Sequence, residues 1–257
     1  MKGFFIKSQI KEMGEGNRCK VECNLNITCI SPGMLVSGYG RLGIYNIGEA
    51  PGETEDRLNR QFVGNTGKRL KQAFERFGVD LYEDCYNDNS VRCRPLKNRE
   101  PEYKEISACR SKIWKDIERL KPKLIFLIGN RALKSFLGHR WNSEKDIGGI
   151  YKWRGFIIPD RDSRCWVAPI FHPSYIERQG DNSVEEVIWL QDIKNALIYL
   201  DKPLPNIDFP IEKDCIEIIT NERKIIRELR GVLKLADEAS IAKADFLMAF
   251  DYETTGL

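Results

Sequence analysis

Short apolar segments alternate with amphipathic segments along the first 200 residues of the chain. Five segments are predicted as strands, at 42–47, 85–91, 123–128, 156–158 and 166–171. The segment at 123–128 is nearly all apolar, which is typical of a strand buried on both faces of a parallel sheet. Four segments are predicted as helices, at 65–77, 102–120, 130–137 and 184–200. The first of these helices carries apolar residues at the i, i+3, i+4 and i+7 spacing of one helix face, namely Leu70, Ala73, Phe74 and Phe77.

This alternation of strands and helices predicts an open α/β sheet. In such sheets ligands bind beyond the carboxyl ends of the strands. Polar or small residues occupy the ends of four of the expected strands, namely Glu49, Asn89, Gly129 and His172. We therefore expect an active site at this edge of the sheet.

A proline-containing segment at 201–210 is predicted to be a linker. Beyond it, 215–220 has the pattern of a strand, 222–236 that of a helix, and a further strand is expected from 244. The sequence thus predicts a domain at 1–200, a linker at 201–210, and a C-terminal α/β fragment at 211–257.

Composition narrows the classes of protein. Hydrophobic residues make up 42% and charged residues 31% of the 257 residues, which excludes a globally disordered chain. The formal net charge of +3 allows a polyanionic partner without indicating one. No apolar stretch approaches the ~18 residues that cross a bilayer, and the N-terminus lacks the pattern of a signal peptide. We expect a cytoplasmic protein without a membrane partner.

The eight cysteines form about 3% of the chain, well below the ~8–10% of a disulfide scaffold. In a cytoplasmic chain, spaced cysteines more often hold a metal than form disulfides. They are Cys19, Cys23, Cys29, Cys85, Cys93, Cys109, Cys165 and Cys215.

An ordered series of short motifs runs from residue 19 to about residue 178. It comprises GEAPGETED at 48–56, FVG at 62–64, Asn89, CRP at 93–95, NR at 98–99 with Pro101, KPK at 121–123, LIG at 127–129, HPSY at 172–175, and Arg178. Together, these motifs resemble the family-4 uracil-DNA glycosylases, the iron–sulfur branch of that superfamily. The resemblance implies a three-layer α/β/α fold with a central, mostly parallel sheet. It also implies hydrolysis of the N-glycosidic bond of uracil in DNA, and hence a role in DNA repair.

The resemblance also implies roles for residues of the motifs. Asn89 would bind the Watson–Crick edge of the extruded base, because an amide can both accept from N3–H and donate to O4. Phe62 would stack on the base, and His172 would stabilise the charge that develops on uracil O2. Glu49 would orient water or balance the cationic sugar. The pocket would be completed by Ala50, Pro51 and Gly52, and DNA would be contacted by Arg92, Arg94, Lys97, Arg99, Ser174 and Arg178.

The same resemblance assigns Cys19, Cys23, Cys93 and Cys109 to a [4Fe–4S] cluster, for which four thiolates are the natural ligands. Zinc accepts the same ligands and is the lesser alternative. Cys29 is close enough in sequence to replace Cys19 or Cys23. The remaining cysteines, Cys85, Cys165 and Cys215, are not expected to be ligands.

Two segments depart from the family pattern. The family usually has Gly and Pro around the stacking phenylalanine, whereas residues 59–62 are Asn-Arg-Gln-Phe. Asn87 and Asp88 replace a pair of the Ile-Thr type and place a carboxylate beside the expected pocket, where it would repel phosphate if exposed.

The last eight residues, FDYETTGL, resemble the first motif of the 3′–5′ exonuclease domain of family-A DNA polymerases. Asp251 and Glu253 lie two apart on an expected strand, where they could share a divalent ion. This likeness implies that the rest of a phage-type DNA polymerase is a partner in the same polypeptide, in the host cytoplasm.

Two other functions remain open from the sequence alone. The chain could be a catalytically weak or inactive DNA-binding or uracil-sensing module of the polymerase. It could also be a structural domain stabilised by zinc.

Overall fold

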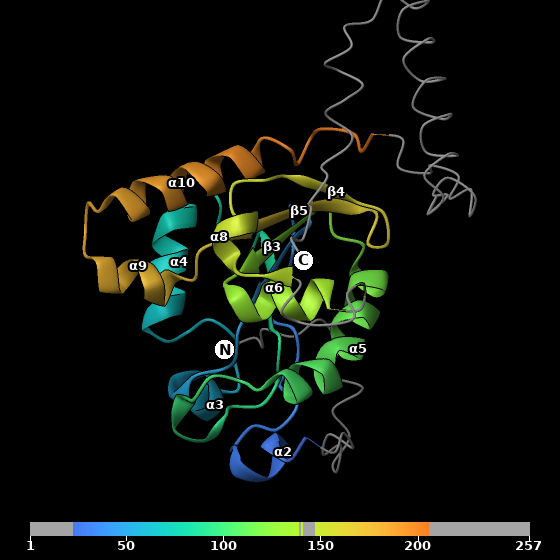
Figure 1. Cartoon of the computed structure of the whole chain (residues 1–257), viewed down its shortest axis with the longest axis vertical. Helices are drawn as coiled ribbons and strands as arrows, with labels where there is room; N and C mark the ends of the chain where they lie inside the picture. The colour runs from blue at the N-terminus through green and yellow to red at the C-terminus, as the bar shows by residue number, and fades with distance from the viewer. Residues whose placement is uncertain (1–22, 139, 141–146, 206–257) are drawn as a thin grey trace, which may run out of the picture. The chain divides into compact units, whose positions relative to one another are not determined.

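The computed structural model describes residues 23–138, 140 and 147–205 of the chain. These residues form a central sheet between two layers of helices (Figure 1). The expected three-layer α/β/α fold is therefore confirmed. Cys19, Cys215, Asp251, Glu253, half of the expected linker and all of 211–257 lie outside the described residues, so the division into domains stays a prediction.

The sheet has five described strands in the order β2-β1-β3-β5-β4. Their bounds are β1 Ile44–Gly48, β2 Cys85–Asn89, β3 Leu124–Ile128, β4 Ile158–Asp160 and β5 Cys165–Ile170. The first three and β5 pair in parallel, whereas β4 runs antiparallel to β5. β4 begins where its predicted segment ends. Among the described strands it pairs only with β5, so Pro159 lies on an edge strand, where a missing N–H is tolerated.

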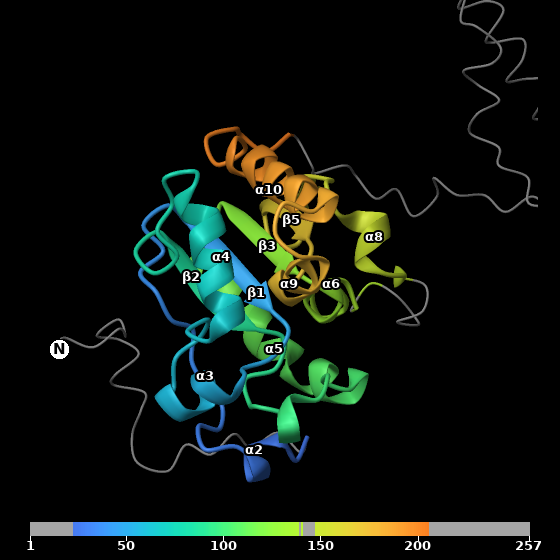
Figure 2. The same ribbon diagram turned by 90° about the vertical axis from the view of Figure 1, so that its left-hand side faces the viewer.

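Helices cover both faces of the sheet (Figure 2). On one face lie α4 Asn65–Glu75, α9 Pro173–Gln179 and α10 Val184–Leu197, and on the other lie α5 Tyr103–Leu120 and α6 Asn130–Leu137. The predicted apolar stripe of α4 faces inward, since Phe74 packs edge-on against Phe126 of β3 with ring centroids 5.2 Å apart. On the opposite face, Trp114 of α5 stacks on Phe136 of α6 at 4.9 Å. No described helix is both long enough and apolar enough to cross a bilayer.

The shorter helices were not predicted. They are α2 Leu25–Thr28, α3 Glu53–Leu58, α8 Ile150–Trp153, α9 and the 3-10 turn Leu96–Asn98. Their starts are set by local features rather than by periodicity. For example, His172 caps α9 through its side chain and Pro173 occupies the first turn, where its missing N–H has no cost. This helix fixes the position of His172 beyond the end of β5.

Candidate active site

The carboxyl ends of the parallel strands meet at one edge of the sheet. Gly48 pairs with Asn89, and Ile128 pairs with Ile170, so the residues that follow these strands emerge side by side. They enclose a cavity of about 620 Å³, within the usual size of a small-molecule site. Ten of the residues predicted for the site line this cavity: Glu49, Ala50, Pro51, Gly52, Phe62, Asn89, Arg99, His172, Ser174 and Arg178. Of the predicted residues other than cysteines, Arg92, Arg94 and Lys97 are not part of the lining.

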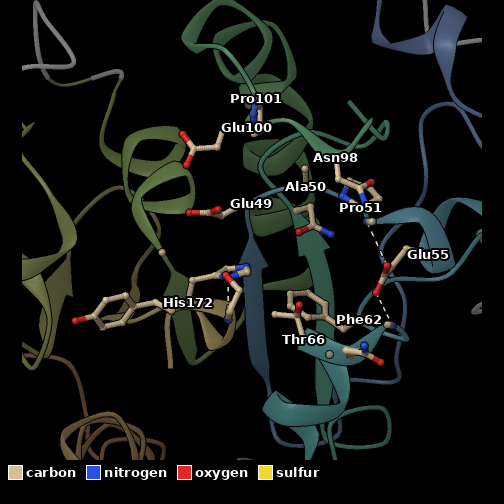
Figure 3. Close-up of a pocket in the computed structure, with 18 of the residues that line it drawn as sticks. Glu49, Ala50, Pro51, Glu55, Phe62, Thr66, Asn98, Glu100, Pro101 and His172 are labelled. Atoms are coloured by element: carbon tan, nitrogen blue, oxygen red, sulfur yellow. Dashed lines mark hydrogen bonds between the residues drawn. The ribbon is translucent and has the colours of Figure 1, made fainter. Parts of the chain in front are cut away.

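Glu49 and His172 lie together on one side of this cavity (Figure 3). A half-buried Glu49 accepts a hydrogen bond from the Arg131 N–H at the start of α6, with an N–Oε1 distance of 3.4 Å. Gly129 has φ +89°, and a Cβ added there would lie 2.6 Å from Glu49 Oε1 and 2.9 Å from His172 Cβ. Glycine at position 129 therefore lets both side chains approach the end of β3.

The hydrogen bonds of His172 determine which ring nitrogen carries the proton. Its Nδ1 lies 3.3 Å from the Ser174 backbone N–H and 2.7 Å from Ser174 Oγ. A backbone N–H can only donate, so Nδ1 is the acceptor, and the neutral ring carries its hydrogen on Nε2. Burial lowers the pKa of His172, and the nearby Arg178 lowers it further, against the opposing effect of Glu49. His172 is thus a neutral hydrogen-bond donor at neutral pH.

Asn89 and Phe62 meet over the end of β1. A Cβ added to Gly48 would lie 2.4 Å from Asn89 Oδ1 and 2.7 Å from Phe62 Cζ, so both side chains lie directly on this glycine. Asn89 is only 4% exposed, and its Nδ2 donates to Gln61 Oε1 at 2.6 Å. An amide and an aromatic ring therefore share one wall of the cavity.

The loop that carries Phe62 is held by residues whose role the sequence did not reveal. Glu55 accepts from the backbone N–H groups of Gly52, at 3.2 Å, and Gly64, at 2.6 Å (Figure 3). The Tyr82 hydroxyl donates to the Phe62 carbonyl at 2.8 Å. Phe62 itself has φ +56°, a left-handed conformation that this bonding stabilises. Glu55 was visible in the GEAPGETED motif, whereas Tyr82 and Gln61 gave no signal of a site role.

Two aromatic residues extend the cavity wall beyond His172. Tyr151 and Tyr175 share a hydroxyl–hydroxyl contact, and both rings pack against Phe171, with centroids 5.0 and 4.9 Å from it. Tyr175 belongs to the HPSY motif, but Tyr151 lies in the unpredicted α8 and could not be found from the pattern.

The prediction that Arg92 contacts DNA is wrong. Arg92 is 5% exposed and is ion-paired with both Asp88 and Asp116. Asp88 is fully buried, and it also accepts from the Tyr45 hydroxyl and the Asn89 N–H, each at 2.8 Å. The carboxylate that departs from the family pattern therefore lies behind Asn89, where it cannot meet phosphate.

The other predicted DNA contacts differ in their surroundings. Arg94 donates to Asn98 at 2.6 Å and pairs with Glu53 at 3.3 Å, outside the cavity lining. Arg99 is held by Glu105 at 2.6 Å, whereas Lys97 is exposed on the 3-10 turn. Arg178 is exposed at the cavity edge, where its Nη1 lies 3.5 Å from Ser174 Oγ.

Four cysteine side chains gather in a small apolar cluster beside the site. Cys23, Cys93 and Cys109 are buried there, and the half-buried Cys29 packs against them. Cys93 accepts from the Gly33 N–H at 3.1 Å and is in hydrogen-bond contact with the Cys29 thiol. Burial, with the Cys29 and Cys109 thiols adding to it and the Gly33 N–H opposing it, raises the pKa of Cys93 to about 12. As arranged in the described part of the chain, no three Cys, His, Asp or Glu residues could hold a metal ion.

The donor chemistry of this cluster nevertheless fits a sulfur-ligated metal. Thiol groups from separate segments converge, and a backbone N–H already points at one sulfur, as occurs around iron–sulfur clusters. By contrast, Cys85 and Cys165 are buried within β2 and β5, which suits core residues.

Comparison with known proteins agrees with this geometry. Residues 38–194 match the model of the uracil DNA glycosylase superfamily, and the chain belongs to that superfamily. It is 35% identical to a type-4 uracil-DNA glycosylase of Thermotoga maritima over 171 residues, 65% of this chain and 84% of the relative. A type-4 uracil-DNA glycosylase of Pyrobaculum aerophilum is 39% identical over 145 residues, 55% of this chain and 71% of the relative.

A third relative is named as a DNA polymerase rather than as a glycosylase. A DNA polymerase of Bacillus phage SP01 is 29% identical over 146 residues, which are 57% of this chain but 15% of the polymerase. The comparisons thus confirm the expectation of a hydrolase of the uracil-DNA glycosylase type. They also show that the chain is similar to part of a phage DNA polymerase.

Proposed function

We propose that this chain excises uracil from DNA, with the base held in the cavity at the strand ends. The observation that carries the proposal is that two groups suited to uracil line the same cavity. One is the amide of Asn89, and the other is a neutral His172 whose free ring nitrogen carries a hydrogen. The first suits the edge of uracil, and the second suits the charge that forms when uracil leaves.

Binding begins with extrusion of the nucleotide from the stack. Phe62 stacks on the extruded base, while Asn89 Oδ1 accepts from N3–H and its Nδ2 donates to O4. Because Glu55 and Tyr82 hold the Phe62 loop, little ordering is needed when the base arrives.

The bond between C1′ of the deoxyribose and N1 of uracil then breaks, and its electron pair stays with uracil. The sugar becomes an oxocarbenium ion, and the negative charge spreads onto uracil O2. His172 donates through Nε2–H to that oxygen, a contact that strengthens as the charge develops. Since Ser174 satisfies Nδ1, the ring is already turned for this task.

Glu49 acts on the sugar side of the reaction. Its carboxylate stabilises the cationic sugar and accepts a proton from the water that adds to C1′, which leaves an abasic site. The proton finally passes to the uracil anion, so free uracil and an abasic deoxyribose are the products. The Arg131 N–H and the close approach at Gly129 hold this carboxylate beside His172.

Phosphates flanking the extruded nucleotide are bound by Ser174, Arg178 and Arg99 at the cavity edge, with Arg94 and Lys97 on the adjoining loop. Arg178 is the strongest of these candidates because it is exposed at the cavity edge. Neutralising phosphates in this way makes binding fall as salt rises.

We further propose that the cysteine cluster holds a [4Fe–4S] centre, as the resemblance to the iron–sulfur branch implies, with zinc as the lesser alternative. Cys23, Cys93 and Cys109 supply three thiolates. The fourth comes from Cys19, as in the family pattern, or from Cys29, which lies beside Cys93. Measuring the iron content of the Cys19→Ser and Cys29→Ser proteins identifies the fourth ligand, because only loss of the true ligand should lower the iron content. When bound, the centre supplies positive charge that stabilises buried thiolates and ties three chain segments together.

The likeness to part of a phage polymerase supports the proposal that this chain is a module of a DNA polymerase. Such a polymerase would work in the cytoplasm of the host. The exonuclease-like motif with Asp251 and Glu253 agrees with this context. Such a module would remove uracil from template DNA during replication or repair.

An alkaline cleavage assay tests the proposed function. The purified chain is incubated with a uracil-containing oligonucleotide and then with alkali, which breaks the strand at abasic sites. We expect strand breaks with the wild type and at least about 100-fold fewer with His172→Ala, the loss typical of removing a donor to a developing anion. Glu83→Gln, an exposed change outside the cavity, should leave cleavage unchanged. Binding of uracil-containing DNA without base release would instead support a sensing module. The absence of both binding and base release would refute the glycosylase and the sensing module alike.

A further inference from the structure

The amide of Gln61 lies directly behind the amide of Asn89. Gln61 is fully buried, and its Oε1 accepts from Asn89 Nδ2 at 2.6 Å. Gln61 occupies one of the positions at which the chain departs from the pattern of its family. The residue is therefore a feature of this chain that its family resemblance does not explain.

The backbone around Gln61 is fixed on both sides. On one side, the Arg60 guanidinium stacks on the Tyr82 ring, 4.3 Å from its centroid, and the Arg60 N–H donates to the Glu55 carbonyl at 3.2 Å. On the other side, the Tyr82 hydroxyl donates to the Phe62 carbonyl. A side chain held on such a support can fix the direction of the group that it contacts.

The direction of the Asn89 amide decides which pyrimidine fits. Uracil presents a donor at N3 and an acceptor at O4, whereas cytosine presents an acceptor at N3 and donors at N4. With one Nδ2 hydrogen given to Gln61, Asn89 keeps its second hydrogen for O4 and its Oδ1 for N3–H. To bind cytosine the Asn89 amide must turn over, which would bring its Oδ1 against Gln61 Oε1 unless the Gln61 amide turned with it. The present arrangement therefore opposes cytosine either through two facing acceptors or through the coupled turn of two buried amides.

We propose that Gln61 is a specificity-determining residue, which holds the Asn89 amide in the direction that accepts uracil and rejects cytosine. The inference rests on the proposed function, because it assumes that Asn89 contacts the base. Gln61 acts through Asn89 and is not itself in contact with the reacting atoms.

A second observation defines how Gln61 does this. Within the described part of the chain, Gln61 Nε2 is buried without a hydrogen-bond partner. Only its oxygen is used, so an acceptor at this position should suffice. Gln61→Glu retains an acceptor of the same shape, and an ionised carboxylate can only accept. Gln61→Met keeps the length of the side chain but removes the acceptor.

The test compares uracil with cytosine at one position of the same oligonucleotide. Both kcat/KM for base release and Kd are measured for the wild type, Gln61→Met and Gln61→Glu. We expect the preference for uracil over cytosine to narrow about tenfold in Gln61→Met, the equivalent of one hydrogen bond of about 1.4 kcal/mol. Gln61→Glu should keep the preference of the wild type. Gln191→Met is the matched control, because Gln191 also bonds an asparagine amide, Asn195 at 2.7 Å, but on the exposed side of α10.

The outcomes separate this inference from the proposed function. Absence of uracil release by the wild type refutes the proposed function, and the ratio of the two Kd values then still tests Gln61. If the wild type releases uracil and Gln61→Met keeps its preference, the inference is wrong while the function stands. A shift toward cytosine in Gln61→Glu would overturn it as well, since Gln61 would then act as a donor. Because the two variants are measured independently, a folding defect in one leaves the other decisive.

Discussion

Replacing Arg92 with methionine tests the buried ion pairs behind the candidate site. Arg92 and Asp88 are both buried, and Asp88 has no other cationic partner among its hydrogen bonds in the described chain. Removing the guanidinium leaves a carboxylate in an apolar environment with the Tyr45 hydroxyl and the Asn89 N–H as its donors. Breaking one partner of a buried pair typically costs about 3–5 kcal/mol. We expect that loss in the free energy of unfolding, a large share of the roughly 5–15 kcal/mol of an ordinary domain.

Urea denaturation followed by circular dichroism measures this loss. The double variant Arg92→Met/Asp88→Asn should regain at least half of it, because no buried charge then remains unpaired. Burial raises the pKa of Asp88, so a more acidic buffer protonates the carboxyl more readily in the folded state than in the unfolded state. The penalty in Arg92→Met should therefore shrink as pH falls and grow as pH rises. A loss below about 1 kcal/mol, or one that the second substitution does not relieve, would refute this reasoning.

Three further predictions concern the histidine, the cysteine cluster and the DNA-binding surface. Because burial lowers the pKa of His172, uracil release should be constant at neutral pH and fall only below about pH 6.5; an acid limb above that value would contradict a neutral donor. Cys93→Ser should lose the iron and sulfide of the purified chain, and Cys165→Ser should keep them; equal loss in both would remove the cluster from Cys93. Arg178→Ala should reduce the slope of log K against log salt by about 0.9 on duplex DNA, whereas Arg161→Ala, beyond the opposite edge of the sheet, should not change it.

Hydrophobic periodicity located the sheet because burial on both faces leaves a strong pattern. The apolar segment at 123–128 became β3 at the centre of the sheet, and the amphipathic segment at 65–77 became α4. Short helices such as α3 and α8 were missed because one or two turns carry no measurable period. They depend on caps and on the surrounding chain, which a local pattern does not contain.

The gathering of Glu49, Asn89 and His172 could be predicted because parallel strands bring their carboxyl ends to one edge. The residues that hold these side chains in place could not be predicted from the sequence. Gln61 lies in a loop, where the backbone is set by long-range contacts rather than by periodicity. Arg92 was assigned wrongly because it is one of several cations in one basic segment, and sequence does not show which of them turns inward to meet an acid.

The single-turnover rate of uracil release by wild type and Asn89→Ala tests the central claim most directly. That claim is that one uracil base is bound in the cavity by the amide at the end of β2. Loss of two hydrogen bonds to the base should lower the rate by about 100-fold, while Asn195→Ala, in the exposed Gln191 pair, should react like wild type. Equal rates for wild type and Asn89→Ala would contradict the account.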